Sequence, residues 1–155
     1  MTTVATAQEE LRELYRELIL DHARSPRHFG KLDDATHWAR GLNPLCGDKL
    51  TIYLVVADGR ITDVRFEGSG CAISIASASL LTETVIGLRT DEALAYLDAV
   101  ADSLTGAGDP PGVDLGKLVA LGGVREFPSR VKCATLPWRA LGAAINNQTA
   151  PATTE

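Results

Sequence analysis

The sequence predicts an α+β fold in which a short antiparallel β-meander of about three strands packs against four to six helices. Apolar residues recur with helical spacing near the N-terminus and again after residue 70. Between these stretches, residues 50–67 alternate around an Asp-Gly turn, which is typical of a hairpin. The 155 residues are enough for one core, so residues 1–155 are expected to form one domain, with disorder at 1–6 and 147–155.

Composition and charge exclude several classes of protein. The net charge of −5 and the isoelectric point near 5.2 argue against a nucleic-acid partner, which normally meets a basic face. The sequence contains no apolar run of the roughly 20 residues that would span a membrane. Residues 1–11 have neither the basic nor the apolar region of a secretory signal, so none is expected there. A reducing cytoplasm is therefore the expected compartment, where a few cysteines more often serve metal or thiol chemistry than a disulfide.

The first helix is expected to begin at a capping box formed by Thr6 and Glu9 and to end near Arg24. One face of it carries the stripe Leu11, Leu14, Tyr15, Leu18 and Ile19, spaced i, i+3, i+4, i+7 and i+8. Such a stripe is typical of a helix that packs on a core. It can also offer surface to a partner, and Tyr15 is the candidate contact residue.

Three strands are expected between residues 36 and 67. A short edge strand at 36–42 precedes a strand at 50–57, whose even-numbered residues share one apolar face. Asp58-Gly59 is the expected two-residue turn of a hairpin, and the returning strand occupies residues 61–67.

The rest of the chain is expected to be mainly helical. The expected helices span residues 71–88, 91–103, 114–121 and about 135–145, with a loop at 105–112. Asp91 is the expected cap of the second of these helices, and Gly122-Gly123 should end the third. Because Pro137 is tolerated only in a first turn, the last helix should not begin much before Thr135.

The stretch Asn43-Pro44-Leu45-Cys46-Gly47-Asp48 places a thiol and a carboxylate two residues apart in a glycine-containing turn. Residues i and i+2 share one side of a strand and can converge in a turn, so Cys46 and Asp48 can bind one metal ion. This triplet alone is a weak signal, since loops contain many like it. Its weight comes from Cys71, at a helix start after a Gly-Ser-Gly bend, and from Cys133, just before the last helix.

Three thiols and one carboxylate make up the candidate metal-ligand set: Cys46, Asp48, Cys71 and Cys133. A helix N-terminus favours the deprotonated thiol that metal binding requires. Zinc accepts such sulfur and oxygen ligands in a tetrahedron, and iron–sulfur clusters also accept thiolates. Lys132 and Arg130 are placed to offset the excess negative charge. The carboxylate is a hard ligand among soft ones, so it should be the more easily displaced.

Other kinds of chemistry have little support in the sequence. Each cysteine could be a small buried apolar residue, although the combination of three with Asp48 disfavours that interpretation. The three histidines lie in the first quarter of the chain without the signature of a cysteine hydrolase, and no Cys-x-x-Cys motif is present. Gly68-Ser69-Gly70 lacks the rest of a dinucleotide-binding fingerprint.

Three segments of the chain resemble the signatures of the IscU/NifU-N iron–sulfur scaffold superfamily. They are residues 43–48, residues 68–74 (Gly-Ser-Gly-Cys-Ala-Ile-Ser) and residues 130–136 (Arg-Val-Lys-Cys-Ala-Thr-Leu). The opening helix, with Leu14-Tyr15 and Asp21-His22, also resembles the N-terminus of that family. The similarity covers residues 10–145, and three motifs in the same order make it specific.

In two features the chain resembles the SufU branch of this superfamily. Lys132 stands before the third cysteine, where IscU-type scaffolds have His, and the segment around 103–119 is longer than in IscU. The resemblance implies a zinc ion held by the four candidate ligands, with Arg130 as a basic residue near the site. It also implies a bacterial cytoplasmic protein whose partner is a PLP-dependent cysteine desulfurase of the SufS type. That partner would pass persulfide sulfur to Cys46, with downstream Suf assembly proteins or apo-proteins as later receivers.

Three functions are compatible with these observations. The leading hypothesis is a zinc-dependent sulfurtransferase, with Cys46 as the catalytic residue because its glycine-containing turn is more mobile than a helix start. The second is a scaffold on which a [2Fe–2S] or [4Fe–4S] cluster is assembled on the same ligands and transferred to apo-proteins. The third is an interaction module in which zinc is only structural.

Overall fold

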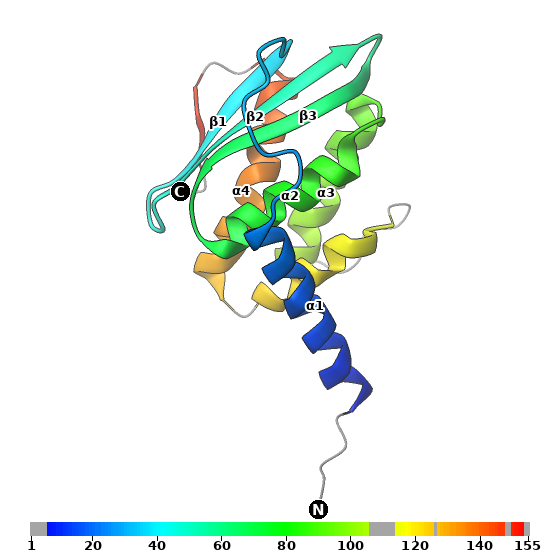
Figure 1. Cartoon of the computed structure of the whole chain (residues 1–155), viewed down its shortest axis with the longest axis vertical. Helices are drawn as coiled ribbons and strands as arrows, with labels where there is room; N and C mark the ends of the chain where they lie inside the picture. The colour runs from blue at the N-terminus through cyan, green and yellow to red at the C-terminus, as the bar shows by residue number, and fades with distance from the viewer. Residues whose placement is uncertain (1–5, 106–113, 126, 148–149, 154–155) are drawn as a thin grey trace, which may run out of the picture.

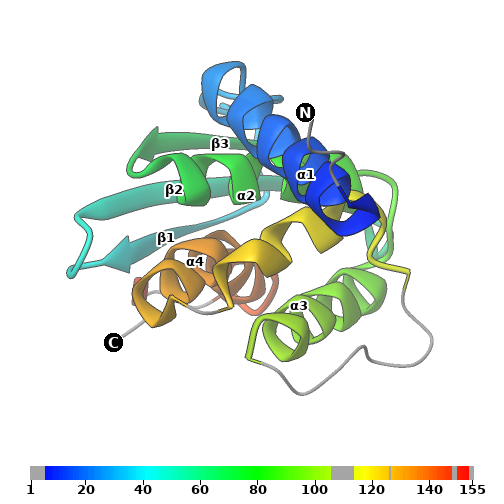
Figure 2. The same cartoon turned by 90° about the horizontal axis from the view of Figure 1, so that it is seen from below.

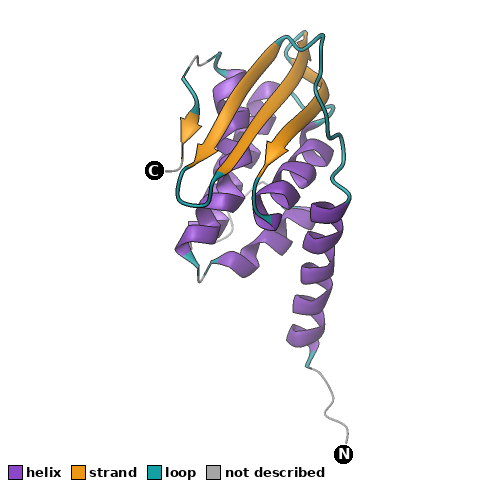
Figure 3. Ribbon diagram, turned by 60° about the vertical axis from the view of Figure 1, so that its left-hand side comes forward, coloured by secondary structure: helices purple, strands orange, loops and turns teal. Residues whose placement is uncertain are grey.

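The computed structural model describes residues 6–105, 114–125, 127–147 and 150–153. In chain order the elements are α1 (Ala7–Arg24), β1 (His37–Asn43), β2 (Asp48–Ala57), β3 (Arg60–Ser69), α2 (Ala72–Val85), α3 (Thr90–Thr105), the 3-10 helix η1 (Gly116–Val124), α4 (Pro128–Ile145) and β4 (Ala152–Thr153). The strands form one sheet with the helices on one side of it (Figures 1 and 3), so the predicted α+β fold is confirmed. Within the described residues, no helix is both long and apolar enough to cross a membrane.

The sheet has the strand order β3-β2-β1-β4, and its first three strands form the predicted antiparallel meander. Asp58 and Gly59 make the β2–β3 turn with positive φ angles of 52° and 75°, which is the geometry a two-residue hairpin turn favours. On β2, Leu50, Ile52 and Leu54 are buried beneath the helices. Helix α4 packs on β1 and β2, and α2 packs on β3, which closes the core on that face (Figure 2).

A fourth strand lies in the C-terminal tail, where the sequence had suggested disorder. Ala152 and Thr153 pair in parallel with Gly41 and Leu42 of β1, which makes the sheet mixed. The expectation of disorder was wrong for these two residues, because a two-residue strand is too short to show an alternating pattern. Residues 1–5, 148–149 and 154–155, which were also expected to be disordered, lie outside the described residues.

Helix α1 starts and ends where the sequence predicts. The Thr6 hydroxyl accepts a hydrogen bond of 3.2 Å from the Glu9 backbone N–H, which is one half of the predicted capping box. The apolar stripe packs on the core only in its later part: Ile19 is buried, whereas Leu11 and Leu14 are 46% and 62% exposed. The first turns of α1 extend away from the body of the protein (Figure 1).

Other helix boundaries differ from the prediction. Helix α2 ends at Val85, three residues earlier than expected, and α3 begins at Thr90, which places Asp91 inside the first turn. The 3-10 helix η1 continues through Gly122-Gly123 because burial of its apolar residues outweighs the low helix propensity of glycine. Most of the predicted loop at 105–112 lies outside the described residues.

Helix α4 begins at Pro128 rather than near Thr135. Proline is favourable at the first position of a helix, because its missing N–H would have no partner there. Pro137 instead lies inside α4, where it removes the hydrogen bond that would reach the Cys133 carbonyl one turn back. Cys133 is therefore in the second turn of α4, and the argument that a helix start favours its deprotonation was wrong.

His22 joins α1 to α2 and predicts a pH-dependent stability. Its ring is fully buried, and its Nδ1 lies 2.7 Å from Ser79 Oγ. Burial, assisted by the charge of Arg27, lowers the pKa of His22 from 6.5. The unfolded chain thus takes up a proton as the pH falls through 6.5 before the folded chain does, so the free energy of unfolding should decrease below that pH.

Urea unfolding at pH 7.5 and pH 5.5 measures this loss. His22→Gln should lose less stability between the two pH values than the wild-type chain, because glutamine does not titrate. The matched control is His37→Gln on β1, where the ring is only partly buried and lies beside Thr36 Oγ1. The assignment is wrong if His37→Gln, and not His22→Gln, removes the pH dependence.

Candidate metal centre

The loop between β1 and β2 holds the first part of the site. Asn43 and Asp48 pair across the two strands and close the loop, in which Gly47 has a φ of 71° that glycine adopts without strain. The Cys46 backbone N–H donates to the Asn43 carbonyl at 3.2 Å, which tightens the turn. Cys46 itself is exposed, so its thiol lies at the tip of a closed hairpin.

The structure brings together three of the four predicted ligands. One sulfur or oxygen atom from each of Cys46, Asp48 and Cys133 lies within 4.8 Å of the others. Asp48 and Cys133 are each only 1% exposed, whereas Cys46 faces solvent. Residues separated by 87 positions in the chain therefore meet where the β1–β2 hairpin contacts α4.

Cys71, the fourth predicted ligand, lies at the edge of this cluster. It is the N-cap residue of α2, which confirms the predicted helix start, and its side chain is half-buried. Its backbone N–H donates to Asp48 Oδ1 at 2.8 Å, and its Sγ lies 3.9 Å from Ser74 Oγ. Cys71 is not part of the group within 4.8 Å, so its role as a metal ligand stays a prediction.

The Gly-Ser-Gly bend before Cys71 lies close against Asp48 and the start of β2. A Cβ atom at Gly70 would lie 2.5 Å from Asp48 Oδ1 and 2.6 Å from Ser74 Oγ, so any side chain there would push into the cluster. A Cβ atom at Gly68 would lie 2.1 Å from the Lys49 carbonyl oxygen. Both glycines are thus required by the contact between this bend and the start of β2.

The protein environment holds Cys133 as a neutral thiol when no metal is bound. Burial raises the pKa of Cys133, and hydrogen bonds with Asp48, Cys46 and Cys71 raise it further. All these effects come from packing thiols and a carboxylate into one buried place. A divalent cation would reverse them, because it favours the thiolate over the thiol.

Asn43 is a residue of the site that sequence reasoning missed. It is 1% exposed, and its Nδ2 donates to Asp48 Oδ2 at 3.2 Å and to Cys133 Sγ at 3.5 Å. Asp48 therefore accepts hydrogen bonds on both oxygens, from Asn43 and from the Cys71 backbone. The expectation that the carboxylate is the easily displaced ligand does not agree with this anchoring, and the exposed Cys46 is the freer group.

The basic residues beside Cys133 have described contacts outside the cluster. The Arg130 guanidinium lies 5.6 Å from the centre of the Phe127 ring, and Lys132 lines a groove of about 450 Å³ between α3 and α4. Neither forms an ion pair with another described residue. Tyr15, the candidate partner contact, is half-buried on α1. The proposed roles of these residues stay predictions.

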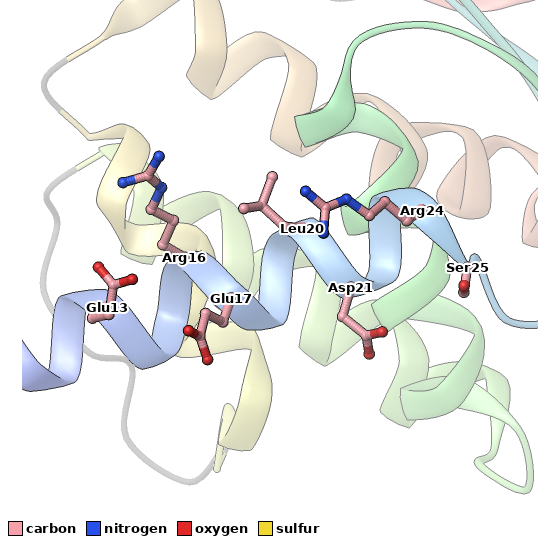
Figure 4. A pocket seen from close by; sticks show the side chains of 7 residues that line it. All are labelled: Glu13, Arg16, Glu17, Leu20, Asp21, Arg24 and Ser25. Atoms are coloured by element: carbon pink, nitrogen blue, oxygen red, sulfur yellow. The ribbon is translucent and has the colours of Figure 1, made fainter.

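A separate depression of about 520 Å³ runs along α1 and has a different chemistry. It is lined by Glu13, Arg16, Glu17, Leu20, Asp21, Arg24 and Ser25. Figure 4 shows Arg16, Leu20 and Arg24 on one side of the helix and Glu17 and Asp21 on the other. It contains no thiol and is a solvated charged surface, so the cluster around Asp48 is the better candidate site.

The donor set of the cluster fits a soft or borderline metal ion. Thiolates select zinc, copper(I) and iron–sulfur chemistry, and one carboxylate is compatible with zinc. Asn43 Oδ1 has no hydrogen-bond partner among the described residues, while the amide nitrogen donates to two site atoms, and this arrangement supports the fit.

Comparisons with known proteins agree with the fold and with the cluster. The NifU-like N terminal domain family matches residues 14–147. The iron-sulfur cluster assembly scaffold protein IscU of Streptococcus pyogenes serotype M1 is 40% identical over 139 residues, covering 90% of this chain and 87% of that protein. The zinc-dependent sulfurtransferase SufU of Bacillus subtilis strain 168 is 40% identical over 132 residues, covering 85% and 89%. The crystal structure of FiSufU from Fervidobacterium islandicum AW-1 superposes with a TM-score of 0.80 at 36% identity, covering 86% and 98%.

The fold, the cluster and the relatives together identify the chain as a member of the class of iron–sulfur cluster assembly proteins. The chain belongs to the NifU-like N-terminal domain family, within the superfamily that contains IscU and SufU. The resemblance proposed from the three sequence motifs is thereby confirmed.

Proposed function

We propose that this protein is a zinc-dependent sulfurtransferase that accepts persulfide sulfur on Cys46 in the bacterial cytoplasm. The observation that carries the proposal is the pairing of an exposed thiol, Cys46, with buried Asp48 and Cys133 within 4.8 Å. In such a site the buried groups, Asp48 and Cys133, can bind a metal ion while the sulfur atom of Cys46 stays accessible to a partner. The SufU relative, whose name states zinc-dependent sulfurtransferase, supports this choice.

Zinc would be held by Cys46, Asp48, Cys71 and Cys133, and when bound it would keep the thiols deprotonated and protected. The partner would be a SufS-type, PLP-dependent cysteine desulfurase that carries a cysteine persulfide. The Cys46 thiolate attacks the outer sulfur of that persulfide, and a new S–S bond forms on Cys46. The S–S bond of the donor breaks, and its electron pair leaves with the donor cysteine as a thiolate. The sulfur then passes to downstream Suf assembly proteins or apo-proteins.

The exposed part of α1 is the proposed contact surface for the desulfurase, together with the loop around Cys46. Leu14 is 62% exposed and lies among Glu10, Glu13 and Glu17, while Tyr15 is half-buried beside it. Leu45, next to the acceptor thiol, is 70% exposed. Apolar side chains left in solvent are suited to burial against a partner, and Leu45 lies directly beside the proposed acceptor thiol.

A second candidate function is that of a scaffold for a [2Fe–2S] or [4Fe–4S] cluster. Relatives named IscU scaffold protein are as similar to this chain as the SufU relative is, and the same thiols could hold a cluster. In that case the iron and sulfide are the cargo of the protein. Arg130 and Lys132 are the proposed basic residues that would balance the charge of either centre.

Native mass spectrometry of anaerobically purified protein separates these functions. We expect a colourless protein with one zinc ion, which gains one sulfur atom on incubation with the desulfurase and L-cysteine. A brown protein with stoichiometric iron and sulfide would favour the scaffold. One zinc ion without any sulfur gain would favour a structural zinc module and contradict the transfer proposal.

A further inference from the structure

Asn43 lies beneath the cluster in an arrangement that the proposed ligand set does not explain. Its side chain is 1% exposed and donates hydrogen bonds to Asp48 and Cys133, two of the proposed ligands. Its own carbonyl oxygen, Oδ1, is buried without a hydrogen-bond partner among the described residues. Few buried side-chain oxygens are left in this state, so the orientation of this amide needs a cause.

The chemistry of the two neighbours supplies that cause. An ionised carboxylate only accepts hydrogen bonds, so the NH₂ end of the amide must face Asp48, and the same nitrogen lies 3.5 Å from Cys133 Sγ. The reverse orientation would place Oδ1 against an oxygen of the Asp48 carboxylate. The amide therefore satisfies the cluster while its own oxygen loses solvation, which destabilises the fold. The orientation of the amide is therefore explained by the hydrogen bonds that it gives to the site, and not by the stability of the fold.

The backbone fixes Asn43 in this position. It pairs with Asp48 at the base of the hairpin, and its carbonyl accepts the Cys46 N–H at 3.2 Å. Pro44 follows it and restricts its backbone to extended conformations. The amide thus holds Asp48 and Cys133, whereas the Cys46 side chain is exposed at the tip of the same loop.

We infer that Asn43 is a positioning residue that holds Asp48 and Cys133 inside the site and leaves Cys46 as the thiol that meets a partner. The inference rests on the proposed function, because it assigns a division of labour among the proposed zinc ligands. Groups that hydrogen-bond to metal ligands commonly change metal affinity by about 10–100-fold. Loss of the amide should therefore weaken zinc binding and expose Cys133 without changing Cys46.

The test compares Asn43→Ala with the wild-type chain and with Asn146→Ala, an exposed asparagine at the end of α4. Zinc affinity is measured by competition with a chromophoric chelator, and the sulfur-to-metal charge-transfer band is recorded with cobalt(II). Iodoacetamide alkylation of each cysteine is followed by mass spectrometry in metal-free and zinc-loaded protein. For Asn43→Ala we expect about 10–100-fold weaker zinc binding, a shifted cobalt band and faster alkylation of Cys133.

Asn43→Ser, which keeps one hydroxyl donor, should give values between those of wild type and alanine. Wild-type zinc affinity and wild-type protection of Cys133 in folded Asn43→Ala would overturn the inference. If Asn43→Ala does not fold, wild-type values in Asn43→Ser overturn it instead. If the wild-type chain binds no zinc, the proposed function fails, but the alkylation of Cys133 in metal-free protein still tests Asn43 separately.

Discussion

Cys46→Ala is expected to abolish sulfur transfer to the protein while leaving its fold intact. Cys46 is the exposed thiol of the cluster, and Cys133, at 1% exposure, cannot reach a persulfide on another protein. The variant removes the nucleophile, so transfer should fall to background. Because the residue lies at an exposed loop tip, the free energy of unfolding of metal-free protein should change by less than about 0.5 kcal/mol.

The measurement is the intact mass of the variant after incubation with a SufS-type desulfurase and L-cysteine, alongside a thermal melt. Cys71→Ala is the matched control, because it removes a thiol of the same cluster but keeps the proposed acceptor. Sulfur should still reach the Cys71→Ala protein at saturating zinc, because Cys46, Asp48 and Cys133 remain together in that variant. Full sulfur gain on Cys46→Ala would show that the acceptor lies elsewhere in the chain.

Much of the site could be predicted from the sequence because its residues lie in short motifs. Cys46 and Asp48 were proposed as partners across a glycine, and the structure places them together with Cys133. The prediction of a turn at Asp58-Gly59 was correct because few residue pairs favour the positive φ angles that such a turn requires. In these cases the local residue chemistry alone specified the geometry.

The remaining features depend on tertiary contacts that no local pattern encodes. Asn43 faces Cys133 across 90 residues of sequence, so its amide donors could not be assigned to a partner in advance. The only available signal was its place at the start of the motif that carries Cys46 and Asp48. The start of α4 was placed too late because Pro137 was taken as a first-turn residue, whereas Pro128 has that role. Because of this error Cys133 was expected at a helix start, whereas it lies buried in the second turn of α4.

Gly68 shows how the sheet and the site depend on one backbone position. It has a φ of 143° and pairs with Leu50 at the end of the β2–β3 ladder. A Cβ atom there would lie 2.1 Å from the Lys49 carbonyl oxygen and 2.8 Å from the Leu50 Cα, and both are backbone atoms that cannot rotate away. Any side chain would separate the strands just before the bend that brings Cys71 to Asp48.

Gly68→Ala is therefore expected to lower the free energy of unfolding by about 3 kcal/mol or more, because it adds a backbone clash to an unfavourable φ angle. For a chain of this size, that corresponds to a fall in melting temperature of about 6–12 °C. Gly123→Ala is the control, since a Cβ atom there meets nothing within 4 Å and its melting temperature should be nearly unchanged. Because strand separation at Gly68 also shifts the Cys71 N–H that holds Asp48, zinc affinity should fall together with stability. Equal melting temperatures for the two variants would mean that the β2–β3 contact at Gly68 is looser than the structure shows.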